Sequence, residues 1–421
     1  MELDSIPQPE LDQIERIGGA DLVVGILGTE SAGDGCGAVA FTRQFLAELP
    51  TPLRAMVVCN NGTHSPAAAA ADVAGDKASP TVFTCALPPS APGETPQQGI
   101  SNAYRTVFVV GGKLGVRACG VIASRSQIAT SRWISSLVHP VLDLGFDLVA
   151  PCYTRQKLEG LLNRSVLAPL HRALYGQQLQ NPMGPDFGLS GKLIHRMLAE
   201  DASRRRGVPR DPLASIASVA ACGGFQVCES NLGIRTQRPT DWENLSSLLA
   251  EVLGAAFLEM EGRAAHWQSI RGSQTLPRFG QPEALSPDPG TTMDVHGMLE
   301  SFRLGAKNLQ DVWGLILPPT TLLELRRLSR LPENQFRLPD QLWVRIVYDF
   351  ALGHRLQTLN RDHLLRSITP LYLGWIASHV LETQADGLVE AESRIERLSK
   401  AYEDNKSYLV SRWRWPDRFN P

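Results

Sequence analysis

Two polar segments follow apolar runs and carry side chains that could bind a ligand. Asn60-Asn61-Gly62-Thr63 follows the run Leu53–Cys59, and Ala123-Ser124-Arg125 closes the run Val116–Ala123. In parallel α/β sheets, ligands bind beyond the carboxyl ends of the strands. Arginine presents a planar fork that can pair with two phosphate oxygens. The spacing therefore predicts that both segments line one site, with Arg125 as a candidate for binding an anionic group.

Alternating apolar runs and helical segments supply the elements that would position these residues. The predicted strands are short apolar runs bounded by polar residues or glycine, as expected for buried parallel strands. They cover residues 21–28, 53–59, 81–87, 116–123 and 146–151, and the predicted helices cover residues 37–49, 100–114 and 133–144. Residues 88–98 are rich in proline and are predicted to form a loop. Repeated strand–helix units predict an α/β fold with a mostly parallel sheet covered by helices on both faces.

The pattern becomes helical beyond residue 290. We predict a lead over residues 1–20, an α/β domain over residues 21–285 and a helical C-terminal region over residues 286–421. The last helix has one apolar stripe with spacings of three and four. The stripe consists of Leu388, Ala391, Ile395, Leu398, Tyr402 and Leu409, with Asn405 interrupting the helix. It either docks on its own chain or forms a contact between subunits of a homo-oligomer.

Composition narrows the class of protein. The chain has 421 residues, with 41 basic and 43 acidic side chains, and this balance predicts no nonspecific binding to nucleic acid. No apolar run reaches the roughly 20 residues of a membrane span, and the acidic start Met1-Glu2-Leu3-Asp4 does not resemble a secretory signal. The seven cysteines form no CxxC pair. A cytoplasmic location is therefore expected.

Several longer stretches resemble one family of enzymes. They are Asp147–Tyr153 with Arg155, Pro169–Gly176, Gly184–Ser190, Cys222–Cys228 and Leu364–Gly374. These stretches resemble retaining glycosyltransferases of the GT-A fold, in the group that contains mannosylglycerate synthase and glucosyl-3-phosphoglycerate synthase. The resemblance extends from about residue 20 to about residue 415. It implies a GT-A nucleotide-sugar domain followed by a helical extension, a nucleotide-sugar donor and a small polar or acidic acceptor.

The resemblance also implies roles for individual residues. Gly28, Thr29 and Glu30 occupy the loop that receives the nucleobase and ribose, and Asn60 and Asn61 stand where an acidic residue often contacts the base. Gly99 and Asn102 lie in the place of a Gly-Lys-Gly-like turn that helps hold the diphosphate, without its lysine. Tyr153, Arg155 and Gly184 are expected to face the cleft.

The family's metal motif is altered in this chain. The two acidic positions of the family's Asp-x-Asp fall on Ala123 and Arg125, with Ser124 between them, and Gln237 stands where a histidine usually completes the metal shell. Mg²⁺ and Mn²⁺ prefer hard oxygen ligands, so these substitutions predict no divalent metal cofactor.

Two explanations of the altered motif remain open, beside a third in which the fold has been recruited to other chemistry. In the first, Arg125, helped by Arg235 or Arg238, neutralises a diphosphate leaving group in place of the metal, and the chain is a metal-independent hexosyltransferase. In the second, the site has decayed and the chain is a noncatalytic pseudoglycosyltransferase that binds a partner.

Asp186 is the second candidate catalytic residue. It lies in Gly184-Pro185-Asp186-Phe187-Gly188, where glycines permit close approach of the backbone to a ligand. Its carboxylate could accept hydrogen bonds from sugar hydroxyls or orient the acceptor. The alternative is a helix N-cap or a turn residue, which is a common role for aspartate.

Overall fold

The structure is a computed structural model of the chain. The residues that it describes are residue 6 and residues 8–27, 34–49, 51–59, 81–87, 96–123, 131–203, 211–234, 244–285 and 293–416. They divide into two compact units that are not continuous in sequence. The first unit comprises residues 1–154, 181–235 and 276–283, and the second comprises residues 155–180, 236–275 and 284–421.

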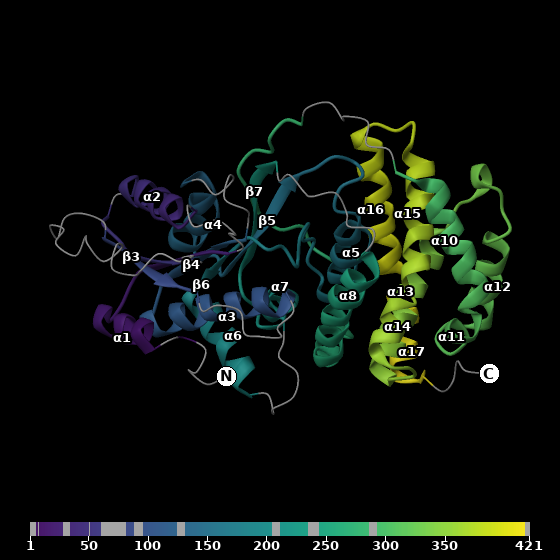
Figure 1. Ribbon diagram of the computed structural model, residues 1–421, viewed down its shortest axis with the longest axis horizontal. Coiled ribbons are helices and arrows are strands. Elements are labelled where there is room, and N and C mark those ends of the chain that lie inside the picture. The colour runs from purple at the N-terminus through teal and green to yellow at the C-terminus, as the bar shows by residue number, and fades with distance from the viewer. Residues whose placement is uncertain are drawn as a thin grey trace. The chain divides into compact units, whose positions relative to one another are not determined.

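The first unit is built on one sheet of eight strands in the order β3-β2-β1-β4-β6-β5-β7-β8 (Figure 1). β6 pairs antiparallel with both β4 and β5, and every other pairing in the sheet is parallel. The strands are β1 (Leu22–Ile26), β2 (Arg54–Cys59), β3 (Thr81–Ala86), β4 (Ala118–Ile122), β5 (Leu148–Thr154), β6 (Phe187–Ser190), β7 (Val227–Ile234) and β8 (Arg278–Phe279).

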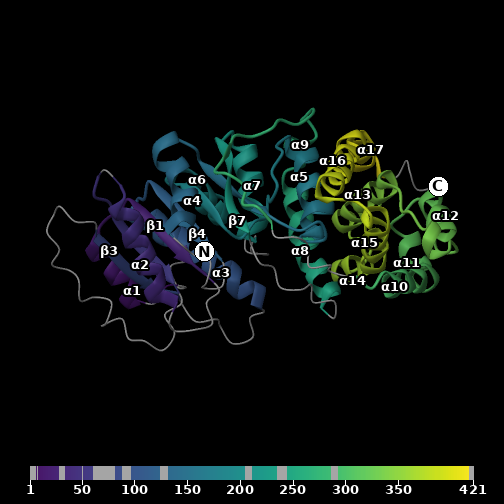
Figure 2. The same cartoon turned by 90° about the horizontal axis from the view of Figure 1, so that it is seen from above.

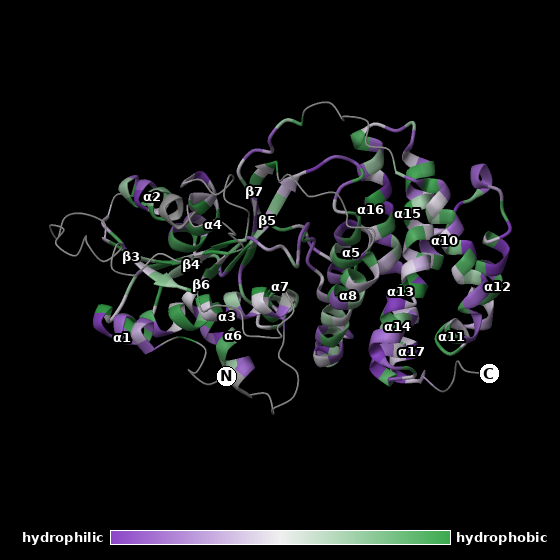
Figure 3. Cartoon of the chain, in the orientation of Figure 1, coloured by the Kyte–Doolittle hydropathy of each residue, from purple (hydrophilic) through white to green (hydrophobic). Residues whose placement is uncertain are grey.

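Helices cover both faces of this sheet because its buried strands present apolar side chains in both directions. In β1, Val24 and Ile26 join the core under α2 and α4, whereas Gly25 faces Val107 of α3. Figure 3 shows green, the colour of apolar residues, along much of the sheet, whereas β5 is paler. The helices of the first unit are α1 (Gln8–Ile17), α2 (Asp34–Ala47), α3 (Pro96–Leu114), α4 (Ser131–Leu144), α6 (Gly191–Ser203) and α7 (Pro212–Cys222).

A pair of glycines lets α4 lie close to the centre of the sheet. Gly120 of β4 and Gly188 of β6 are partners in the antiparallel register. A Cβ atom at Gly120 would lie 2.9 Å from a methyl carbon of Val138, and one at Gly188 would overlap the carbonyl group of Leu137. Neither α4 residue could keep its place against a larger side chain, so the two glycines set the distance between α4 and the sheet.

The second unit consists of helices. They are the π-helix η4 (Asn163–Leu167), α5 (Ala168–Tyr175), α8 (Leu245–Gly262), α9 (Ala264–Trp267), α10 (Val295–Asn308), α11 (Gln310–Gly314), α12 (Pro319–Leu328), the 3₁₀ turn η5 (Glu333–Gln335), α13 (Asp340–Leu356), α14 (Arg361–Arg366), α15 (Thr369–Thr383), α16 (Leu388–Asp404) and α17 (Lys406–Arg414) (Figure 2). The long helix α13 packs against α8, α14, α16 and α17, and its central residues are buried.

The predicted α/β fold class, with a mostly parallel sheet covered by helices on both faces and a helical C-terminal region, is confirmed. All five predicted strands and all three predicted helices are present. The predicted loop over residues 88–98 is wrong at its end, because α3 begins at Pro96. Proline is favoured in the first turn of a helix, since its missing N–H has no partner there in any helix. The predicted lead contains α1, and the boundary near residue 285 stays a prediction.

The apolar stripe of the last helix is buried against its own chain. Asn405 separates α16 from α17, as the sequence suggested. Within the stripe, Ala391, Leu398 and Tyr402 are fully buried, and α16 packs against α5 and α13. These contacts confirm the interpretation of a helix docked on its own chain, whereas homo-oligomerisation stays a prediction. Among the helices that the structure describes, none is both long and apolar enough to cross a membrane.

Candidate functional site

The order in which strands are added to the sheet reverses between β1 and β4. β1 pairs with β2 on one side and with β4 on the other, both in parallel, so successive crossovers run first one way and then the other. Just beyond the strands, the amide of Leu27 donates to the carbonyl of Ile122 at 2.9 Å. A parallel sheet opens a crevice at such a switch point, outside the carboxyl ends of the strands.

The residues predicted for the site divide into those that the structure describes and those that it does not. Gly28, Thr29, Glu30, Asn60, Asn61, Ser124, Arg125 and Gln237 lie outside the described residues, as do Arg235 and Arg238. Among the residues predicted for the site, the structure describes Gly99, Asn102, Tyr153, Arg155, Gly184 and Asp186. The altered motif is thus described only at its first position, Ala123.

Asp186 connects the ends of two strands. Its side chain is fully buried, immediately before β6. One carboxylate oxygen accepts a hydrogen bond of 2.8 Å from the amide of Ala123, and the other accepts a short hydrogen bond from the hydroxyl of Tyr153. A buried carboxylate needs such donors to offset its lost hydration. Asp186 is therefore neither a helix N-cap nor an exposed turn residue, and it holds the backbone at the start of the altered motif.

Tyr153 supplies the second donor to this carboxylate. The predicted end of this strand at residue 151 is wrong, and Tyr153 lies within the strand, because β5 continues to Thr154 through its pairing with β7. Its ring is buried and lies 6.3 Å from the ring of Trp133 on α4, at an interplanar angle of 37°. Tyr153 and Asp186, which the sequence predicted separately, are thus brought into direct contact.

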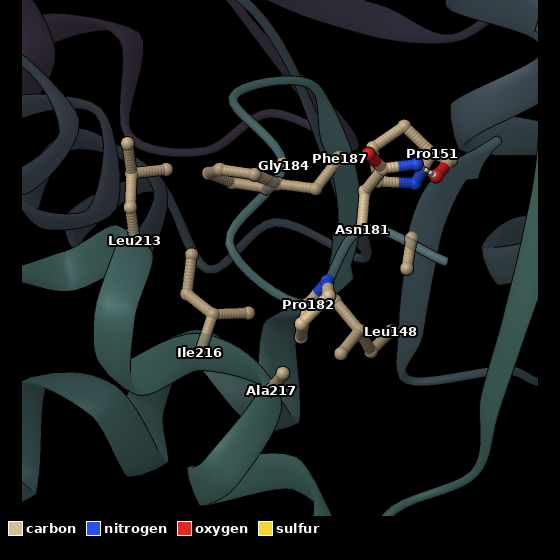
Figure 4. Close-up of a pocket in the computed structure, with 10 residues that line it drawn as sticks. Leu148, Pro151, Asn181, Pro182, Gly184, Phe187, Leu213, Ile216 and Ala217 are labelled. Carbon is tan, nitrogen blue, oxygen red and sulfur yellow. Dashed lines mark hydrogen bonds between the residues drawn. The ribbon is translucent and has the colours of Figure 1, made fainter. Parts of the chain in front are cut away.

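The loop before β6 is held by a third group, Asn181, which the sequence did not indicate. Its side-chain amide donates to the carbonyl of Pro151 at 2.9 Å (Figure 4). Its backbone carbonyl accepts a hydrogen bond from the amide of Gly184. A Cβ atom at Gly184 would overlap the ring of Pro151, so this glycine is needed for packing. The hydroxyl of Tyr104 donates to the carbonyl of Pro185 at 2.8 Å.

A small cavity of about 10 Å³ lies beside this loop. Leu213 and Ile216 of α7 line it together with Phe187, as Figure 4 shows. This volume corresponds to about one water molecule. The cavity is a packing feature of the loop and is too small to receive a nucleotide-sugar.

Gly99 and Asn102 lie within the first turns of α3, so the expected turn before a helix is wrong. The side-chain oxygen of Asn102 accepts a hydrogen bond of 2.8 Å from Arg105, whose guanidinium is buried and lies 3.9 Å from Asp201. Burial lowers the pKa of Arg105 below its usual value, although the nearby carboxylates of Asp201 and Asp211 act in the opposite direction. The sequence did not single out Arg105, although it is the one arginine of α3, two residues before the apolar run Val107–Val110.

Arg155 belongs to the second unit. Its guanidinium lies against Gly160, which has a φ of +64° and could not carry a Cβ without overlapping it. Nearby, the ammonium of Lys157 donates to the carbonyl of Thr383, the last residue of α15, and to that of Asp386, three residues further on. These contacts anchor the loop that follows β5 within the helical unit.

Of the described residues at the altered motif, Ala123 and Asp186 do not offer a set of ligands suited to a divalent cation. The side chain of Ala123 is a methyl group, and both oxygens of the neighbouring Asp186 already accept hydrogen bonds. Mg²⁺ and Mn²⁺ need several oxygen ligands with accessible lone pairs. Within the described part of the chain, no group of three or more His, Cys, Asp or Glu side chains could hold a metal ion.

The fold and the position of the altered motif define an α/β protein with a candidate ligand crevice at the switch point of its sheet. No protein-family model matches the chain, and no curated protein matches it. Among solved structures, it is similar to a mycobacterial protein with 18% identity and a TM-score of 0.37, over 59% of this chain and 77% of that one.

Two structures of glucosyl-3-phosphoglycerate synthase from Mycobacterium tuberculosis are similarly distant. The complex with Mn²⁺, UDP and glucosyl-3-phosphoglycerate has 16% identity and a TM-score of 0.36, over 60% of this chain and 83% of that one. The complex with Mn²⁺, UDP-glucose and phosphoglyceric acid has 16% identity and a TM-score of 0.36, over 61% and 88%.

Proposed function

We propose that this chain is a glycosyltransferase-like protein that binds a nucleotide-sugar between the ends of β1 and β4. The observation that carries this proposal is the place of the altered motif. Ala123 directly follows β4, and Leu27 directly follows β1, at the point where the strand order reverses. This is the general position of ligands in open parallel sheets. The residues predicted to bind the nucleotide and its diphosphate continue from these two strand ends.

Arg125 supplies the positive charge that the reaction needs. It stands two residues after Ala123 in the sequence, and its guanidinium can donate two parallel hydrogen bonds to a diphosphate. In the proposed reaction, the bond from the sugar's anomeric carbon to the diphosphate oxygen breaks, and its electron pair stays on the diphosphate. Arg125 stabilises this developing negative charge, which is the role of the metal in enzymes that use one.

Retention of configuration follows if the acceptor attacks from the same face as the leaving group. The acceptor oxygen then forms the new bond to the anomeric carbon, and its proton passes to the departing diphosphate. This route needs no side chain as a general base. The acceptor is a small polar or acidic molecule. UDP-glucose and phosphoglyceric acid, which the synthase complex contains, are the first donor and acceptor to test.

The second candidate function is that of a noncatalytic pseudoglycosyltransferase that binds a partner. It is favoured by the joint loss of the acidic pair at Ala123 and Arg125, the lysine near Gly99 and the histidine at Gln237. All of these residues handle the diphosphate or its metal in the family that the chain resembles. Under this alternative the fold remains while the nucleotide site is lost.

Binding of UDP-, GDP- and ADP-sugars by calorimetry separates the two functions. Each donor is titrated into the protein with Mg²⁺, with Mn²⁺ or with EDTA. We expect one nucleotide class to bind with the same Kd in all three conditions, because the positive charge is part of the protein. Absence of binding by every donor at millimolar concentration would favour the pseudoenzyme, and binding only with a divalent ion would refute the metal-independent mechanism.

A further inference from the structure

Residues 124–130 connect β4 to α4 and include Ser124 and Arg125. The residues on either side of this connection, Ala123 and the start of α4, are described. Ala123 is hydrogen-bonded to Asp186, just before β6, and Trp133 at the start of α4 packs against Tyr153 of β5. These two buried side chains, Asp186 and Tyr153, are hydrogen-bonded to each other.

The first attachment is a hydrogen bond to the backbone. The amide of Ala123 donates to Asp186 at 2.8 Å, although the two residues are 63 positions apart. A hydrogen bond to a carboxylate is stronger than one between neutral groups, and burial strengthens it further. Because the hydroxyl of Tyr153 donates to the other oxygen, the carboxylate is held from both sides. The direction in which the chain leaves β4 is therefore set by a rigid group.

The second attachment is a packing contact. Trp133, in the first turn of α4, is 5% exposed and its ring lies against that of Tyr153. Two residues after Asp186, Gly188 brings the backbone of α4 into close contact with β6. The start of α4 is thereby fixed relative to the same tyrosine that orients Asp186.

We infer that Tyr153 and Asp186 are positioning residues that together fix both ends of the connection carrying Ser124 and Arg125. This inference deepens the proposed function and rests on it only for the expected effect on donor binding. Neither side chain needs to touch the donor. A binding group is effective when residues behind it hold it in place through packing and hydrogen bonds.

Three variants separate the parts of this arrangement. Asp186→Ala removes both acceptors. Asp186→Asn keeps an oxygen for the amide of Ala123 and can turn its NH₂ group toward the hydroxyl oxygen of Tyr153. Tyr153→Phe keeps the ring against Trp133 and removes only the hydroxyl, so it also serves if Asp186→Ala fails to fold.

Hydrogen exchange at the amide of Ala123 tests the inference without any ligand. We expect exchange at least about tenfold faster in Asp186→Ala, because the amide loses a charged acceptor. Tyr153→Phe should give a smaller acceleration, and Asp186→Asn should restore most of the protection lost in the alanine variant. The same rate in the wild type, Asp186→Ala and Tyr153→Phe would overturn the inference.

Tyr104→Phe is the matched control. It makes the same chemical change in a buried tyrosine, whose hydroxyl donates to Pro185 next to Asp186. We expect unchanged exchange at Ala123 in this variant. An acceleration as large as that in Tyr153→Phe would mean that losing any hydrogen bond to the loop before β6 has the same effect, and it would also overturn the inference.

Donor affinity supplies the functional readout. With the donor found by calorimetry, Tyr153→Phe and Asp186→Ala should raise Kd more than Tyr104→Phe does, and Asp186→Asn should recover part of the loss. Faster exchange with unchanged affinity would show that the pair does not position the binding residues. If the wild type binds no donor, the proposed function fails, and the exchange rates still decide whether the pair fixes Ala123.

Discussion

Replacing Gly188 with alanine is expected to destabilise the first unit by about 3 kcal/mol, at the upper end of the usual range for overpacking. The added Cβ would overlap the carbonyl group of Leu137. A backbone group cannot rotate away as a side chain can, so either α4 or β6 must move. Because both elements border the candidate site, the variant should also impair donor binding.

Calorimetric unfolding measures this effect. A loss of this size lowers Tm by about 6–12 °C, since about 2–4 °C corresponds to 1 kcal/mol in a domain of this size. Hydrogen exchange in peptides from β4 and β6 shows which of the calorimetric unfolding transitions belongs to the first unit. Gly314→Ala is the control, because a Cβ at that helical glycine would meet no atom within 4 Å. Gly188→Ala with the Tm of the wild type would show that the close packing of α4 on β6 is not required.

Acidification from pH 7 to pH 5 is expected to destabilise the second unit by about 4 kcal/mol, about 2 kcal/mol for each of two buried histidines. Burial lowers the pKa of His171 to about 4. Burial and the cations Arg394, Arg164 and Lys157 lower the pKa of His379 to about 3. The unfolded state, with an ordinary histidine pKa of about 6.5, binds more protons than the folded state in this range. The contribution of the two neutral histidines to the free energy of unfolding is therefore fully present above about pH 7. It is lost as the pH falls below about 6.5 toward their pKa values in the folded state.

Tryptophan fluorescence during urea unfolding reports mainly on this unit. Seven of the eight tryptophans belong to it, namely Trp242, Trp267, Trp313, Trp343, Trp375, Trp413 and Trp415. The variant His379→Leu should halve the pH dependence, whereas His296→Ala, whose side chain is mostly exposed, should leave it unchanged. Equal pH dependence in the wild type and His379→Leu would show that His379 does not contribute.

The sheet could be predicted from the sequence because its strands are coded locally. Runs such as Leu22–Ile26 and Ala118–Ile122 are uniformly apolar, as buried parallel strands require. β6 was not predicted, because the strand has only four residues and one of them is Gly188, and glycine has a low propensity for strands. Its place is set by pairing with β4 and β5, whose positions in the sheet no local pattern encodes.

The candidate site was only partly predictable for the same reason. The sequence singled out Asp186 and Tyr153 through resemblance and expected both to face a ligand. In the structure, Asp186 is fully buried and accepts hydrogen bonds from Ala123 and Tyr153. No local pattern reveals such contacts between distant segments. The sequence could therefore indicate that Asp186 and Tyr153 belong to the candidate site, whereas their roles depend on the packing around them.

We propose that Arg125 provides, in place of a metal ion, the positive charge that binds the donor diphosphate. The most direct test is the Kd of the donor in EDTA for the wild type, Arg125→Ala and the control Arg132→Ala, which removes an exposed arginine from the start of α4. We expect metal-independent binding that Arg125→Ala weakens by about 10- to 100-fold, the effect of losing a charged hydrogen-bonding group. Arg132→Ala should bind like the wild type. Equal affinity of Arg125→Ala and the wild type, or binding that disappears in EDTA, would contradict this role of Arg125.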